Sequence, residues 1–144
     1  MVNAERILLA LDRQLNHEVP FILYGRAAIA LGFRNPPEDV TKSLDVDAII
    51  PVSRTSIFRA DTNFWDAQEA VNRELMKEGL YITHLFEANQ LVLRLNWEEE
   101  ILPVMCPAMR WLRLFRPATL DLILTKMMRG DDPQDMADVA FPAR

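Results

Sequence analysis

The sequence has a single cysteine and lacks any long apolar run. One thiol cannot form an intramolecular disulfide, so Cys106 excludes a small secreted scaffold that depends on disulfides. Charged residues occupy the first turns of the chain, where a signal peptide would need an uninterrupted apolar segment. The most apolar C-terminal stretch is broken by Asp121 and Lys126, well short of the ~20 residues that span a bilayer. We therefore expect a cytoplasmic protein with no membrane-spanning segment.

An excess of basic residues is also missing. The 16 lysines and arginines are outnumbered by 21 aspartates and glutamates, which gives a net charge of −5. This charge repels a phosphate backbone at long range, so nonspecific binding to nucleic acid is not expected. At 144 residues, with 50% hydrophobic and 26% charged residues, the composition is that of a globular protein. We expect one domain, residues 1–144.

Hydrophobic periodicity predicts an α+β fold. Apolar residues three and four apart indicate a helix over residues 4–15, with Asn3 as its N-cap. A short apolar run at 21–24 is closed by Gly25 and followed by an alanine-rich segment, 27–31, which indicates a strand, a glycine turn and a helix. Residues 32–42, with Gly, Asn and two prolines, predict an exposed loop.

The remaining elements follow from the same patterns. A strand is expected at 44–52, and two helical pieces are expected over 53–78, the second capped by Asp61 or Asn63. Runs at 81–86 and 91–95 predict a hairpin. Residues 110–115 fit either a helix or a third strand, with the strand favoured, and Pro117 opens a helix through residue 129. On a helix, but not on a strand, Arg110, Arg113 and Arg116 would form one basic face.

Two aspartates stand out on the second predicted strand. Because side chains alternate along a strand, Asp45 and Asp47 point to one face and lie about 6.6 Å apart at their Cα atoms. Two carboxylates at this spacing can share one Mg²⁺, and without a cation or donor they repel each other. A solvated polar strand face is the alternative interpretation. An EF-hand is excluded, because Ile49 and Ile50 stand where its loop needs an acid or amide and a glycine.

The order of these parts resembles the nucleotidyltransferase superfamily, whose signature is an apolar strand, a Gly-Gly or Gly-Ser turn at a helix start, and a second strand carrying Asp-x-Asp. Here the turn is Gly25-Arg26-Ala27 and the acids follow Lys42-Ser43. The chain is most similar to small bacterial nucleotidyltransferase-like proteins allied to AbiE-type toxins, in which a basic residue and a threonine precede the acids. The resemblance implies a mixed β-sheet backed by helices.

The resemblance also implies a function. Mg²⁺ or Mn²⁺ would be the cofactor, and a nucleotide would pass from a nucleoside triphosphate to an acceptor that the sequence does not identify. A related segment covers residues 121–138, where a lysine would reach a phosphate. The implied metal-binding and catalytic residues are Asp45 and Asp47, and the implied nucleotide-binding residues are Gly25, Arg26, Lys42, Ser43 and Lys126.

Two departures from the family pattern keep other functions open. Arg26 replaces the usual second Gly or Ser, and the next strand has no clear third acid, Glu87 being the nearest. The second hypothesis is therefore a catalytically lapsed relative that binds a nucleotide or a protein partner, as part of a toxin–antitoxin pair. A third is a protein-interaction module in which Asp45 and Asp47 keep an edge strand soluble.

Overall fold

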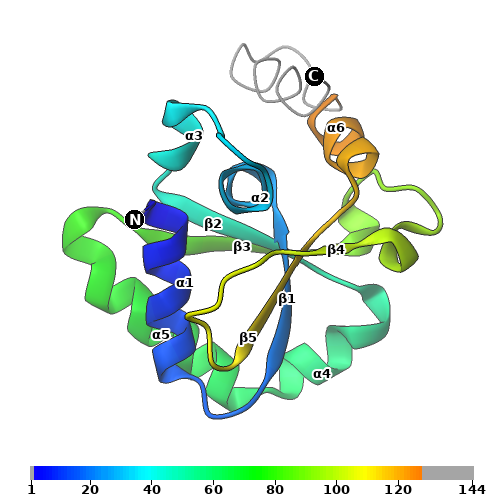
Figure 1. Cartoon of the computed structure of the whole chain (residues 1–144). Helices are drawn as coiled ribbons and strands as arrows, with labels where there is room; N and C mark the ends of the chain where they lie inside the picture. The colour runs from blue at the N-terminus through cyan, green and yellow to red at the C-terminus, as the bar shows by residue number, and fades with distance from the viewer. Residues whose placement is uncertain (1, 128–144) are drawn as a thin grey trace.

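A five-stranded mixed sheet runs through the centre of the computed structural model, which describes residues 2–127, with the side chains of residues 83, 84, 126 and 127 excepted (Figure 1). The strand order is β3-β2-β1-β5-β4. Strand β1 is antiparallel to β2 and parallel to β5, β2 is parallel to β3, and β4 is antiparallel to β5. The strands are β1 (Val19–Tyr24), β2 (Asp45–Ile50), β3 (Tyr81–Glu87), β4 (Leu102–Pro103) and β5 (Leu112–Arg116).

The helices surround this sheet and connect its strands. The α-helices are α1 (Asn3–Gln14), α2 (Gly25–Gly32), α3 (Glu38–Thr41), α4 (Thr55–Ala60), α5 (Thr62–Leu75) and α6 (Thr119–Met127). Short 3₁₀ turns are η1 (Val52–Arg54), η2 (Met76–Glu78), η3 (Ala88–Gln90) and η4 (Trp97–Glu100). Over the part of the chain that is described, no helix has the length and apolar character to cross a membrane.

The larger core lies on the face of the sheet covered by α1 and α5, which Figure 1 shows side by side. From β2, Val46, Ala48 and Ile50 point into this core. Phe64 of α5 is completely buried and contacts the rings of Phe21 and Phe58. Each fully buried side chain of this size contributes roughly 1.5–3 kcal/mol, so this face supplies most of the hydrophobic stabilisation.

A smaller apolar cluster lies on the other face, where Ile22, Tyr24 and Ile49 pack beneath Trp97. The segment that follows β3 lies over this part of the sheet, on the side away from α1 and α5 (Figure 1). Asp45 and Asp47 belong to the same face of β2 as Ile49, since residues two apart share a face. The apolar cluster therefore covers one end of this face and leaves the two acids beyond it.

The predicted strand–glycine–helix–strand order is confirmed. The segments predicted as strands at 21–24 and 44–52 contain β1 and β2, which are neighbouring strands of one mixed sheet. Asp61 is confirmed as the cap of α5, since its carboxylate accepts a hydrogen bond from the Phe64 N–H at 3.0 Å. The favoured strand near 110–115 is β5. The loop expected at 32–42 contains the single helical turn α3.

The predicted hairpin is wrong. Residues 91–95 form no strand, and β3 pairs in parallel with β2 instead. Leu91 and Leu93 pack against the smaller apolar cluster, and the Arg94 N–H donates to the Asp121 carboxylate rather than to a neighbouring strand. Alternating apolar residues thus fit a loop that packs onto a sheet as well as they fit a strand.

One further expectation is corrected. Asn3 is the first helical residue rather than the cap, which is Val2, and its side-chain amide donates to the Lys42 carbonyl oxygen at 3.3 Å. As expected for a strand, the three arginines near β5 form no single basic face: Arg113 is exposed, while Arg116 is buried with its guanidinium 4.1 Å from the Phe33 ring centroid. Burial lowers the pKa of Arg116.

Candidate functional site

Asp45 and Asp47 lie on an interior strand of the sheet. Strand β2 has β1 on one side and β3 on the other, with Asp47 opposite Tyr24 and Asp45 opposite Tyr81. Both acids are half-buried and alternate with buried apolar residues, as the sequence pattern predicts. The idea that the pair protects an edge strand is therefore wrong, because β2 has no free edge.

Gly25 places a tight turn directly beside Asp47. It adopts the left-handed conformation, with φ of 63°, at the point where β1 ends and α2 begins. A β-carbon added to Gly25 would lie 3.9 Å from the Asp47 Oδ2 atom. The missing side chain thus leaves room for another group to approach both the backbone of the turn and the Asp47 carboxylate.

The first turn of α2 brings backbone N–H groups to this place. Its N-cap residue, Tyr24, supplies no side-chain hydrogen bond, and the first turn contains no acidic residue. The first four N–H groups of a helix have no partner within the helix, and the helix dipole adds positive potential there. A phosphate or carboxylate of a ligand is the type of group that such an end binds.

Arg26 follows Gly25 and is held by α3. Its Nη2 atom lies 3.3 Å from the Asp39 Oδ2 atom, and 22% of the Arg26 side chain is exposed against 72% for Asp39. An ion pair with one partner this exposed contributes about 0–1 kcal/mol. The contact with Asp39 therefore adds little to the stability of the fold.

Lys42 and Ser43 lie in the short connection between α3 and β2, just before Asp45. The Lys42 ammonium is 2.9 Å from a Glu38 carboxylate oxygen, and both side chains are mostly exposed. Ser43 donates its backbone N–H to the Val40 carbonyl oxygen. The structure thus places both residues at the Asp45 end of β2, with the Lys42 charge paired across one helical turn.

Lys126 lies near the end of α6, but its side chain is outside the described part of the structure. The rest of the segment that resembles the family, residues 128–138, also lies outside it. On the described part of this helix, Asp121 and Thr125 are buried. A contact between Lys126 and a nucleotide phosphate therefore remains a prediction.

Glu87, the nearest candidate for a third acid, lies at the other end of its strand. It is opposite Ile50, whereas Asp45 is opposite Tyr81, and it forms an ion pair with Arg59 at 2.8 Å. Among the side chains that the structure describes, no group of three or more His, Cys, Asp or Glu residues is arranged to hold a metal ion. This part of the chain thus offers a cation the pair Asp45 and Asp47 rather than a triad of acids.

Two other buried acids organise the protein without belonging to this site. Asp12 accepts hydrogen bonds from the N–H groups of Arg110, Trp111 and Leu112. Burial raises the pKa of Asp12, but these three bonds and the Arg113 charge together hold it below its ordinary value. One signal was present in the sequence, because Asp12 falls four residues after Leu8 on the apolar face of its helix.

Asp121 is completely buried in α6 and binds Arg94 through both carboxylate oxygens. The hydrogen bonds that Arg94 donates to Asp121 and to Glu100 raise the pKa of Arg94. This network ties the segment after β3 to α6, and that segment covers the smaller apolar cluster. Nothing in the local sequence pairs Arg94 with an acid 27 residues away.

The site as a whole offers two kinds of chemistry. Two carboxylates are suitable oxygen ligands for Mg²⁺, which commonly takes one or two carboxylates and completes its shell with water and substrate phosphates. The Gly25 turn and the α2 amides can receive an anion next to them. No protein-family model, curated protein or solved structure matches the chain in comparisons with known proteins.

Proposed function

We propose that this protein is a Mg²⁺-dependent nucleotidyltransferase that acts in the cytoplasm, with a nucleotidyltransferase-type fold. The observation that carries the proposal is the position of Asp45 and Asp47 beside the Gly25 turn, with Asp47 Oδ2 3.9 Å from where a Gly25 β-carbon would lie. A metal-binding pair and an anion-binding helix start then meet at one place. That combination suits a complex of a metal ion with a triphosphate better than it suits a metal ion alone or an anion alone.

Each residue has a defined task in this proposal. Asp45 and Asp47 hold the cation, and the backbone at Gly25 and the first α2 amides bind the phosphates. Arg26, Lys42 and Lys126 supply positive charge to the triphosphate, and Ser43 supplies a hydroxyl. A Mg²⁺ held by these two carboxylates would supply charge neutralisation for the triphosphate and for the departing pyrophosphate. The acceptor is a hydroxyl or amine on a molecule that the site does not identify.

A second candidate is a relative that binds a nucleotide or a protein partner without catalysis, as one half of a toxin–antitoxin pair. The ion pair between Arg26 and Asp39 favours it, because the residue that replaces the family's second small residue is already engaged by α3. The position of Glu87 at the far end of β3 favours it as well. Nucleotide binding would be retained in this case and transfer lost.

Thermal melts with Mg²⁺ or Mn²⁺ and each of ATP, GTP, CTP and UTP test ligand binding. A ligand at a hundredfold excess over its Kd stabilises the folded state by about 2.7 kcal/mol, so a clear rise in Tm is expected. Asp45→Asn with Asp47→Asn should abolish the rise. The matched control is Glu98→Gln with Glu99→Gln, two exposed acids whose removal changes the net charge equally, and this variant should respond like the wild type.

Incubation with labelled nucleotides and a cell extract then separates the two candidates. An enzyme leaves covalently labelled acceptors that the Asp45/Asp47 double variant does not produce, whereas a binder leaves none. If no combination of cation and nucleotide shifts the wild-type Tm, nucleotide binding fails for both candidates. A protein-interaction module would then be the better account of the chain.

A further inference from the structure

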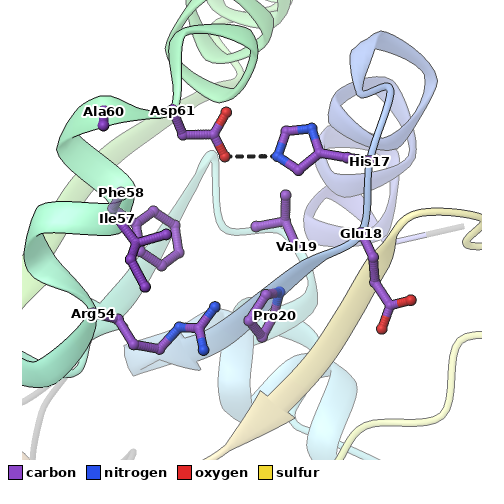
Figure 2. A pocket seen from close by; sticks show the side chains of 9 residues that line it. All are labelled: His17, Glu18, Val19, Pro20, Arg54, Ile57, Phe58, Ala60 and Asp61. Carbon is purple, nitrogen blue, oxygen red and sulfur yellow. Dashed lines mark hydrogen bonds and ion pairs between the residues drawn. The ribbon is translucent and has the colours of Figure 1, made fainter.

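A cavity of about 450 Å³ lies at the opposite end of β1 from the Asp45/Asp47 site. It opens between the start of β1 and helix α4, and Figure 2 shows the side chains that surround it. Val19 and Gly25 are separated by six residues of extended chain, which corresponds to about 20 Å. The cavity is therefore a separate place on the molecule, and its volume is within the range of about 300–1,000 Å³ typical of small-molecule sites.

Most of the wall of this cavity is apolar. The apolar lining residues are Val19, Pro20, Ile57, Phe58 and Ala60. Ile57 is 57% exposed although it is a large apolar side chain on a short helix that packs against the sheet. Exposed apolar surface that lines a concave place, rather than being scattered singly, is typical of a binding site.

One cation points into this apolar space. Figure 2 shows the Arg54 guanidinium reaching toward Pro20, another residue that lines the cavity. Its Nε atom is buried and has no hydrogen-bond partner within the described residues. Leaving a buried donor unsatisfied costs about 1–3 kcal/mol or more when the group is charged, so the protein alone does not fully satisfy this guanidinium.

The other polar groups of the wall are already engaged. The His17 Nε2 atom is 2.7 Å from the Asp61 Oδ2 atom, and His17 also contacts Asn16 through Nδ1. Asp61 in addition caps α5. Glu18 lies 3.4 Å from the Arg113 guanidinium. The described wall thus contains one buried side-chain donor without a hydrogen-bond partner, the Arg54 Nε atom.

We propose that this cavity binds a small organic carboxylate, with its apolar body against Ile57, Phe58 and Val19 and its carboxylate on Arg54. A guanidinium binds a planar carboxylate through two parallel hydrogen bonds. A dianionic phosphate fits less well, because Asp61 and Glu18 place two further negative charges in the same wall. The ligand class is a monoanion with an alkyl or aryl body.

The test uses 4-phenylbutyrate and its neutral analogue 4-phenylbutan-1-ol, titrated into ¹⁵N-labelled protein and followed by NMR. The acid should move the amide signals of Val19, Ile57, Phe58 and Ala60 and bind at least tenfold more tightly than the alcohol. Arg54→Gln should remove this preference. Arg59→Gln is the matched control, since Arg59 is a nearby exposed arginine paired with Glu87 outside the cavity, and it should keep the preference.

Three outcomes would overturn the proposal. Equal affinity of the wild type for the acid and the alcohol would show that Arg54 does not receive the ligand. An equal loss in Arg54→Gln and Arg59→Gln would reduce the effect to general electrostatics. Signal changes confined to residues outside the cavity would place the ligand elsewhere. If Arg54→Gln fails to fold, the acid and alcohol titrations of the wild type still decide the question.

Discussion

Two glycines in the left-handed conformation provide a matched experiment on the candidate site. Gly25 has φ of 63° and lies beside Asp47, while Gly79 has φ of 70° and ends the turn that precedes β3. Among the described residues, a β-carbon at Gly25 would meet only Asp47 Oδ2, at 3.9 Å, and one at Gly79 would meet nothing within 4 Å. Replacing either by alanine therefore introduces backbone strain without a steric clash.

The expected cost is the same for both variants. A non-glycine residue in the left-handed region loses roughly 1–2 kcal/mol. For a chain of this length that loss corresponds to a decrease in Tm of roughly 2–8 °C. Urea denaturation and thermal melts of Gly25→Ala and Gly79→Ala, measured side by side, give the two values directly.

The two variants should differ in their affinity for Mg²⁺ and a nucleotide, although they should lose similar amounts of stability. The added methyl group of Gly25→Ala occupies the space between the turn and the Asp47 carboxylate, so the stabilisation by Mg²⁺ and a nucleotide should fall by tenfold or more in apparent affinity. Gly79→Ala should bind as the wild type does. The reasoning is refuted if Gly25→Ala is neutral, if it costs far more stability than Gly79→Ala, or if the two variants bind equally.

Two further predictions concern the buried acids. Asp12→Asn should lower the free energy of unfolding by about 1–3 kcal/mol at pH 7, because the amide cannot accept the Arg110 N–H at its nitrogen. Since the pKa of Asp12 is lowered by folding, its contribution is complete above the unfolded pKa of about 3.9 and is lost as the pH falls through the folded pKa. Urea denaturation at pH 7 and pH 3 should therefore show that the difference in free energy of unfolding between the wild type and Asp12→Asn becomes smaller at pH 3. An equal difference at the two pH values would contradict this. Asp121→Asn should lower Tm more than Glu100→Gln, because Asp121 is completely buried and Glu100 is partly exposed; equal Tm values would show that the Arg94 network does not secure α6.

The local parts of the candidate site were predictable from the sequence for a physical reason. The alternation of Asp45 and Asp47 with apolar residues and the glycine after an apolar run are properties of a few consecutive residues. Such patterns determine which face a side chain occupies and where the backbone turns. Pairing β1 with β2 then brought Gly25 to Asp47, two residues that the sequence separates by more than a loop and a helix.

The features that the sequence did not indicate are contacts between residues that lie far apart in the chain. Asp12 binds three backbone N–H groups about a hundred residues away, and the apolar alternation at Leu91 and Leu93 serves a packed loop rather than a strand. The cavity at Arg54 combines the start of β1 with α4 and the cap of α5. No short motif marks such a place, since its residues are brought together only by the packing of elements.

The position of β2 inside the sheet is the strongest structural argument that the two aspartates have a role beyond solubility. An acid on an edge strand faces water and discourages pairing with another chain, but β2 is an interior strand, which pairs with β3 from Asp45 onward and with β1 from Asp47 onward. On the same face, Ile49 is covered by the apolar cluster around Trp97, and apolar residues at positions 45 and 47 could have extended that cluster.

These two positions instead hold half-buried carboxylates, next to the turn at Gly25. Two like charges at such spacing raise the free energy of the folded state to the extent that positive charge or hydrogen-bond donors do not compensate them. A cation held between Asp45 and Asp47, with the phosphates of its nucleotide at the start of α2, would add to that compensation from both sides.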